Sequence, residues 1–327
     1  MSYKNENMKT IELHENGLDI QFRIRENGVV ELADFSSQEV KKAVMEPKDD
    51  ICYPAVEIHR SGTGSLNMHA YKNNINQSSV DFVYENHELK AQAGGKELEI
   101  VMISPEKLKA VYHMRLFDGV PAVQTWTEII NEGSEDQGLT YVSSFMYQGI
   151  SRGGEKPYYK KTDIYVPFNS WCCEAQWQKY DAETLNLNGM VVDGFNHQGY
   201  GLNRYCYSGK GTWSTCEYLP MGIAEDRETG ETYIFQIESS GQWLAEYGSA
   251  QGGNLYLALS GATEQEHGWY KNLKPGESFT TVPAGAAVVK GGLNPAAAAL
   301  TRYRRKVRRP NTDDEKLKWY LMITWNA

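Results

Sequence analysis

The sequence contains no long hydrophobic run. No stretch of its 327 residues approaches the ~20 consecutive apolar residues that a membrane-spanning helix requires, which argues against a helical membrane protein. The first residues, MSYKNENMKTIELHENG, hold no apolar segment after the first basic residue, so they do not read as a secretory signal. These two absences predict a cytoplasmic protein with no membrane partner.

Cysteine is scarce, and its five residues form no repeated CxxC pair. An odd number in a chain without a signal argues against a disulfide framework, so we expect reduced thiols. If the adjacent Cys172 and Cys173 lie on a strand, they point to opposite faces, which favours two buried side chains over ligands of one metal. The histidines show no HExxH spacing, and we expect neither a metal nor another cofactor.

Positive charge is in deficit. The formal net charge is -9, which disfavours a general nucleic-acid partner. The glycine-rich segments GGKE and GGLN are not followed by a phosphate-loop pattern, so nucleotide binding has no support. Neutral ligands such as sugars remain open.

Short strands separated by turn signals fill most of the chain. The segment IELHENGLDIQFRIRENGVVELADF alternates apolar and polar residues around Asn16-Gly17 and Asn27-Gly28, the strongest hairpin signal in a sequence. Further turns are expected at Asp118-Gly119, Thr229-Gly230 and Pro275-Gly276. So many strands at this spacing predict a mainly β fold, a large antiparallel sandwich over residues 1–292.

The pattern changes to that of a helix at Leu293. Asn294 is the expected N-cap, Pro295 suits the first helical position, and residues 296–299 are all alanine. Apolar residues then recur at helical spacing and would bury one face of this helix: Ala296, Leu300, Tyr303 and Val307.

Basic residues crowd the last turns of this helix, and Pro310 is expected to end it. A solvated helix end or a contact between domains explains them better than nucleic-acid binding. The polar stretch PNTDDEKLK and the apolar run WYLMITW follow. The sequence thus predicts a second part, residues 293–327, that consists of a linker helix, a charged linker and a lone strand-like end.

Several segments, in order along the chain, resemble the N-terminal part of bacterial α-galactosidases of glycoside hydrolase family 36, the melibiase type. These segments are RLFDGVPAVQTWTEIINEG, LTYVSSF, FNSWCCEAQWQ, YLPMGIAEDRETGETYIFQIESSGQW, LKPGESFTT and GGLNPAAAALTRYRRKVRRPNTDDEKL. The resemblance covers about residues 55 to 317. It implies a galactose mutarotase-like β-supersandwich followed by a (β/α)8 barrel, of which this chain would hold only the beginning.

The same resemblance has a consequence for catalysis. A retaining glycosidase needs two carboxyl groups about 5 Å apart, a nucleophile and an acid/base. In the family both are Asp residues on barrel strands, and neither position exists in this chain. We therefore expect no catalytic residue here, and we expect the chain alone not to hydrolyse α-galactosides. The implied partners are the missing barrel, an α-galactoside and further copies of the parent chain.

Two segments supply candidate sugar contacts, since aromatic faces stack on pyranose rings and planar polar groups bind hydroxyls. NSWCCEAQWQKY brings together Trp171, Glu174 and Trp177, although a core-facing tryptophan pair is favoured over a sugar platform. YPAVEIHRSGTGSLNMHAYKNN has the glycine, serine and asparagine content of an exposed loop. In the resembling enzymes a loop in this region can reach an active site, which makes candidates of His59, Arg60, His69, Tyr71 and Lys72. Solvated loop residues are the alternative.

Two other functions stay open. The chain could be a free-standing carbohydrate-binding module that acts through its aromatic surface, since it contains 21 tyrosines and 8 tryptophans. It could also be a mutarotase-like sugar enzyme with His and Glu or Asp as acid and base, by analogy of fold alone.

Overall fold

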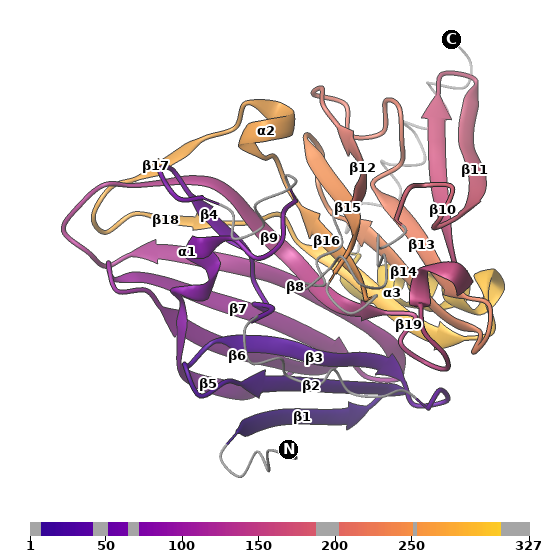
Figure 1. Cartoon of the computed structure of the whole chain (residues 1–327), viewed down its shortest axis with the longest axis horizontal. Coiled ribbons are helices and arrows are strands. Elements are labelled where there is room, and N and C mark those ends of the chain that lie inside the picture. The colour runs from indigo at the N-terminus through magenta and orange to yellow at the C-terminus, as the bar shows by residue number, and fades with distance from the viewer. Residues whose placement is uncertain (1–7, 42–51, 65–71, 188–202, 251–253, 309–327) are drawn as a thin grey trace, which may run out of the picture.

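The computed structural model describes residues 8–41, 52–64, 72–187, 203–250 and 254–308. These residues form antiparallel sheets and few helices (Figure 1), which confirms the predicted mainly β class. None of the described helices is long and apolar enough to cross a membrane.

The strands of the first half are β1 (Lys9–Glu15), β2 (Leu18–Ile24), β3 (Val30–Ser37), β4 (Ile58–Arg60), β5 (Val83–Gln92), β6 (Gly95–Ile103), β7 (Leu108–Phe117), β8 (Val120–Asn131), β9 (Gln137–Ile150) and β10 (Thr162–Ser170). The strands of the second half are β11 (Cys173–Asp181), β12 (Arg204–Gly209), β13 (Met221–Asp226), β14 (Glu231–Ile237), β15 (Trp243–Ser249), β16 (Leu255–Ser260), β17 (Lys271–Leu273), β18 (Ser278–Thr280) and β19 (Ala284–Lys290). The helices are α1 (Gln77–Val80), the 3₁₀ turn η1 (Tyr158–Lys161), α2 (Glu264–His267) and α3 (Leu293–Val307).

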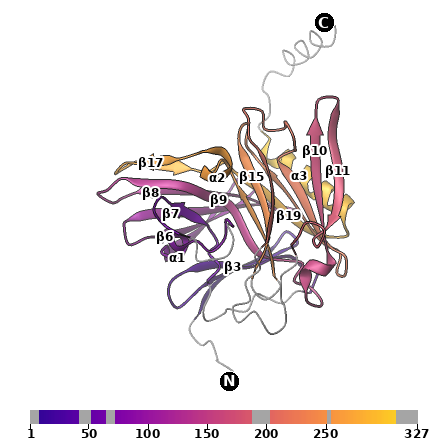
Figure 2. The ribbon, with the colours of Figure 1, turned by 45° about the horizontal axis from the view of Figure 1, so that its top comes forward.

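Three sheets make up the sandwich. A ten-stranded sheet runs in the order β11-β10-β13-β14-β19-β8-β7-β6-β5, with β18 also paired to β8. A six-stranded sheet runs β12-β15-β16-β9-β17, with β4 also paired to β9, and a three-stranded sheet runs β1-β2-β3. Because β4, β17 and β16 all pair with β9, this long strand organises the smaller layer (Figures 1 and 2).

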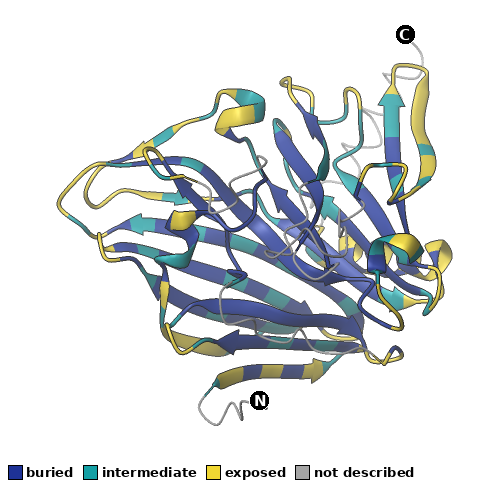
Figure 3. Ribbon diagram, in the orientation of Figure 1, coloured by how far each residue is buried: buried dark blue, intermediate teal, exposed yellow. Residues whose placement is uncertain are grey.

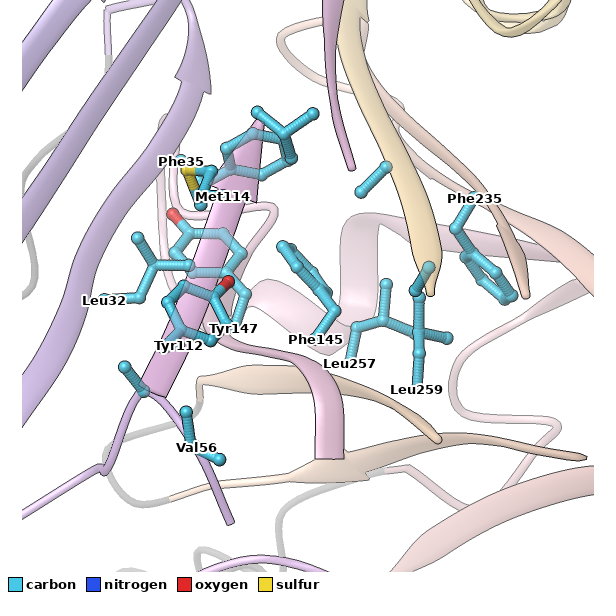
Figure 4. Packing of buried hydrophobic residues seen from close by; sticks show 14 of the residues in the cluster. Leu32, Phe35, Val56, Tyr112, Met114, Phe145, Tyr147, Phe235, Leu257 and Leu259 are labelled. Carbon is cyan, nitrogen blue, oxygen red and sulfur yellow. The ribbon is translucent and has the colours of Figure 1, made fainter. Parts of the chain in front are cut away.

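Aromatic and aliphatic side chains from all three sheets meet in one core (Figure 4). Phe35 of β3 lies 5.5 Å, between ring centroids, from Phe145 of β9 and 6.3 Å from Tyr233 of β14. Phe22 of β2 meets Tyr112 of β7 edge-on. Alternation along each strand sends these residues inward, so burial of their apolar area holds the layers together.

The predicted hairpin turns are confirmed. Asn16 and Gly17 join β1 to β2, and both have positive φ, as a tight two-residue turn requires. The turns at Asp118-Gly119 and Thr229-Gly230 join β7 to β8 and β13 to β14, and Gly119 and Gly230 again have positive φ. Asparagine and glycine tolerate this conformation, which is why the sequence predicts these connections well.

The predicted C-terminal helix is α3, and it packs on the outer face of the ten-stranded sheet. Four of its residues are buried: Ala296, Ala299, Leu300 and Tyr303. Tyr303 contacts Phe117 of β7 edge-on at 5.5 Å and donates a hydrogen bond to Glu238. Gly285 of β19 leaves room for this ring, because a Cβ there would lie 2.4 Å from it.

The predicted start of α3 is two residues late. The helix begins at Leu293 and its N-cap is Gly292, which caps it without a side-chain hydrogen bond. Gly291 and Gly292 both have positive φ and turn the chain sharply after β19, so the first helical turn forms before Asn294. Pro295 fits because the first-turn N–H groups have no intrahelical acceptor. Pro310 and the segments PNTDDEKLK and WYLMITW lie outside the described residues.

Since Leu300 is buried against the sheet, the variant Leu300→Ala should lower the free energy of unfolding by about 2–4 kcal/mol. The neighbouring Thr301→Ala removes an exposed side chain and should change it by less than about 0.5 kcal/mol. Urea unfolding followed by tryptophan fluorescence gives both values. Equal, small effects of the two variants would show that α3 does not pack on the sandwich.

Candidate functional site

The segment Lys72–Asn76 is polar in sequence but buried in the structure. Lys72 is 3 % exposed, and Asn73 and Asn74 are each 1 % exposed. Asn74 and Gln148 of β9 exchange amide hydrogen bonds of 2.6 and 3.3 Å. Buried polar groups need hydrogen-bond partners, so this segment is part of the packed interior of the domain and not a surface loop.

Glu246 of β15 holds the first half of this segment. Its carboxylate is fully buried and accepts hydrogen bonds from the backbone N–H of Asn73 (2.9 Å), the Asn73 amide (2.9 Å) and Tyr256 (2.5 Å). Arg204 of β12 supplies the opposite charge, with Nη1 at 2.7 Å from Glu246 Oε2. Since burying a carboxylate costs several kcal/mol without partners, these contacts are needed to keep it there.

Glu57, just before β4, holds the second half of the segment Lys72–Asn76. It is fully buried and accepts hydrogen bonds from the N–H groups of Ile75 (2.5 Å) and Asn76 (3.2 Å) and from the hydroxyl of Ser79 in α1 (2.6 Å). Ile75 has φ +58°, a strained conformation for a β-branched residue. A strained backbone of this kind persists only where surrounding contacts fix it. Here the hydrogen bond from the N–H of Ile75 to Glu57 is such a contact.

Lys72 lies at the edge of the same cluster. Its Nζ donates to the backbone oxygen of Ser249 (2.7 Å) and lies 5.8 Å from the centre of the Tyr256 ring. Burial lowers the pKa of Lys72 to about 8, and the charge of Glu246 opposes that shift. This amine is therefore easier to deprotonate than an ordinary lysine.

His59 and Arg60 are not solvated loop residues, and this alternative was wrong for both. They lie on β4, 5 % and 8 % exposed. The His59 ring lies 4.7 Å from that of Tyr141, and Arg60 pairs with Glu106 (2.8 Å) and Asp81 (3.2 Å). Pairing with β9 and the cover of α1 explain their burial. His69 and Tyr71 lie outside the described residues.

The tryptophans of NSWCCEAQWQKY do not form a core pair, contrary to the favoured interpretation. Trp171 is 82 % exposed at the turn between β10 and β11, and Cys172 takes the left-handed conformation there. β11 is an edge strand whose residues are mostly exposed (Figure 3), so Glu174 also faces solvent. Trp177 is partly buried against the cluster that contains α3.

The two candidate segments are not brought together. β4 and the β10–β11 hairpin lie on opposite sides of the molecule (Figure 1). Cys172 and Cys173 are exposed because they belong to this protruding hairpin, so the expectation of buried thiols was wrong. All five cysteines are free. The sugar-contact role proposed for either segment stays a prediction.

One group in the described residues has the donor atoms of a metal site: Glu97, Glu99 and His113, on β6 and β7. Its carboxylates already face cations, with Lys90 Nζ 2.5 Å from Glu99 and Arg115 Nε 3.6 Å from Glu97. The His113 ring stacks on Trp126 at 4.7 Å. This arrangement is that of cross-strand ion pairs on the outer face of a sheet.

A concavity runs along α3. It has a volume of about 660 Å³ and lies between the helix, β19 and the turns after β1 and β7. Lys290, Arg302 and Arg305 line it, together with one acidic residue, Glu39. None of its described lining residues is aromatic, so these residues offer no stacking surface for a sugar, and the concavity fits the predicted solvated or interdomain face instead.

Sequence reasoning missed the residues that organise the buried cluster, namely Glu57, Glu246, Arg204 and Tyr256. A signal was present for the two carboxylates. Each is a single charge inside an apolar strand-like run, AVEIH and WLAEYGS, where a buried charge implies a distant partner.

No protein-family model and no curated protein matches this chain. Solved structures do. The α-galactosidase AgaA of glycoside hydrolase family 36 from Geobacillus stearothermophilus, as a variant in complex with stachyose, matches 94 % of this chain at a TM-score of 0.70 and 14 % identity. AgaB from the same organism matches 91 % of this chain at a TM-score of 0.68, and the α-galactosidase from Lactobacillus brevis matches 93 % at a TM-score of 0.66, both at 14 % identity.

These matches cover less than half of the α-galactosidase chains, between 42 and 44 %. The protein Slr1438 from Synechocystis sp. PCC 6803 is matched over 99 % of its own length and 89 % of this chain, at a TM-score of 0.50 and 12 % identity. At such low identities the matches show the fold, and at that level they confirm the resemblance to family 36 α-galactosidases.

The pKa of Lys72 leads to a pH prediction. Between about pH 8 and 10.5 the unfolded chain keeps a proton on Lys72 that the folded chain has lost, so unfolding becomes less favourable as the pH rises. Relative to Lys72→Met, the free energy of unfolding of the wild type should rise by about 1–2 kcal/mol between pH 7.5 and 9.5.

Denaturant unfolding at several pH values tests this, with Lys274→Met as a control at an exposed lysine. The difference in unfolding free energy between the wild type and Lys274→Met should not change with pH. A flat profile for Lys72→Met as well would mean that the amine is solvated.

Proposed function

We propose that this chain is the noncatalytic β-supersandwich part of a retaining α-galactosidase, which acts on terminal α-galactosides. The main support is that 94 % of the chain superposes on only 44 % of an α-galactosidase chain. On this proposal, the rest of the enzyme, a (β/α)8 barrel, carries the nucleophile and the acid/base.

The chemistry of the described residues agrees with this division. Retaining hydrolysis needs two carboxyl groups about 5 Å apart that face a bound sugar. Glu97 and Glu99 bring carboxylate oxygens within 4.8 Å of each other, but Gln92, Arg115, His113 and Lys90 contact these carboxylates. These contacts are cross-strand pairs that stabilise the sheet.

The buried cluster gives the domain its part in sugar recognition. Glu57 and Glu246 fix Lys72–Asn76, and Tyr71 and His69 precede Lys72 in the chain by one and three residues. On our proposal this anchoring positions the sugar-contacting loop beside the barrel's active site, in its own or a neighbouring subunit of a homo-oligomer in the cytoplasm. Rigid support of this kind reduces the entropy lost when a loop binds its ligand.

A free-standing carbohydrate-binding module is the second candidate. The match to Slr1438 favours the free-standing sandwich alone and not its sugar binding, because that chain is covered almost completely but its name gives no ligand. The gene beyond the codon for Ala327 separates the two: a following barrel supports the α-galactosidase part, whereas an early stop codon supports the module.

The purified chain should not hydrolyse an aryl α-galactoside, because the carboxyl pair that this hydrolysis needs is expected on the barrel. It should also not accelerate the mutarotation of freshly dissolved α-galactose, a reaction that needs only a general acid and a general base, because on our proposal the sandwich has no catalytic role. Release of the aryl group and polarimetry measure the two activities. Glu97→Gln serves as the control: turnover by the wild type that this variant abolishes would overturn the proposal and assign catalysis to the sandwich.

If a barrel follows in the gene, a second measurement tests the supporting role. The barrel expressed alone should lose most of its activity, and co-expression with this chain should restore it. Full activity of the barrel alone would contradict that role.

A further inference from the structure

A small pocket lies between the residues on either side of α2, β18 and the loop before β15, and none of its described lining residues is charged. It has a volume of about 220 Å³, and nine residues line it: Val142, Gln242, Gly261, Ala262, Trp269, Phe279, Thr280, Thr281 and Val282. At about 30 Å³ for each liquid water, this space holds roughly seven waters. It therefore suits one small neutral molecule rather than an ion or a long chain.

Two aromatic rings form one wall of this pocket. The ring centroids of Trp269 and Phe279 lie 5.1 Å apart at an interplanar angle of 45°, and both residues are partly exposed. Aromatic faces of this kind offer the C–H face of a pyranose an apolar surface that polar side chains cannot offer. Gly261 and Ala262 lack long side chains, which leaves the space in front of them open.

Gln242 and Thr280 add hydrogen-bonding groups to the lining. Gln242 donates its Nε2 to the backbone oxygen of Lys210 (2.9 Å), so its Oε1 is left as an acceptor. Thr280 is exposed, and its hydroxyl can donate or accept. A few fixed polar groups beside an apolar wall are the usual composition of a site for a polar, uncharged ligand.

The local backbone holds Trp269 in place. Thr263 caps α2 by accepting a hydrogen bond from Glu266 N (3.1 Å), and Gly268 ends the helix at φ +63°. The N–H of Trp269 then donates to the oxygen of Thr263 (3.1 Å), which closes the turn. His267 anchors this turn to β12, since its Nε2 donates to the oxygen of Gly209 (3.2 Å).

We propose that this pocket binds one neutral pyranose unit, stacked on Trp269 and Phe279 and hydrogen-bonded to Gln242 and Thr280. None of the residues that line the pocket belongs to the buried cluster around Glu57 and Glu246. The pocket binds sugar without hydrolysing it, so the proposal does not depend on the α-galactosidase function. About a dozen sugar atoms in so small a site give an affinity on the order of millimolar.

Titration of the full chain with methyl α-galactopyranoside tests the proposal, with the indole N–H signals of the eight tryptophans followed by NMR. The Trp269 signal should shift and saturate, while that of the exposed Trp213 should not move. Trp269→Ala should weaken binding at least about tenfold by calorimetry, as expected for the loss of a stacking wall. Trp213→Ala is the matched control and should leave binding unchanged.

A second variant covers the case in which Trp269→Ala does not fold. Ala262→Leu keeps both rings and fills the pocket, so it should also abolish the Trp269 shift. Saturation by methyl α-glucopyranoside as well would support the proposal, since only a pyranose is required. No Trp269 shift up to roughly a hundred times the expected millimolar affinity would overturn it. So would a shift that follows protein concentration without sugar, which would assign the pocket to self-association.

Discussion

Two buried carboxylates, Glu57 and Glu246, hold the candidate functional segment of this domain. Each accepts backbone N–H bonds from the segment Lys72–Asn76 while sitting on or beside a strand of the six-stranded sheet. A buried charge is costly unless it is paired, so the groups that donate hydrogen bonds to Glu57 and Glu246 cannot move away without a loss of stability. The same contacts hold Ile75 in a strained left-handed conformation. A polar stretch with loop-like composition thereby becomes part of the rigid sandwich.

The rest of the fold stabilises the sheets that carry Glu57, Glu246 and the segment Lys72–Asn76. The aromatic core that joins β3, β9 and β14 fixes the layers, and α3 closes the outer face of the large sheet through Leu300 and Tyr303. Both candidate sugar-binding features, the anchored segment and the Trp269 pocket, lie on elements whose backbones are held by such contacts. Recognition on rigid elements loses less conformational entropy than recognition on free loops.

The sequence predicted what depends on local chemistry. Asn16-Gly17 and the alanine run after Pro295 specify a turn and a helix within a few residues, and the structure has both. The burial of Lys72 was not predictable in this way, because Glu246 lies 173 residues beyond Asn73 in the chain and only the folded sheet brings them together. Trp171 was misplaced for a related reason. Its alternation with Trp177 suggested a buried face, but β11 proved to be an edge strand that extends into solvent.

The account depends most on the rigidity of Lys72–Asn76, and native-state hydrogen exchange measures it directly. The amides of Asn73, Ile75 and Asn76 donate to Glu246 and Glu57, so they should exchange only when the whole domain unfolds, as slowly as core amides of β9 and β15. Exchange of these three amides at the rate of an exposed loop, with the core strands still protected, would contradict the account.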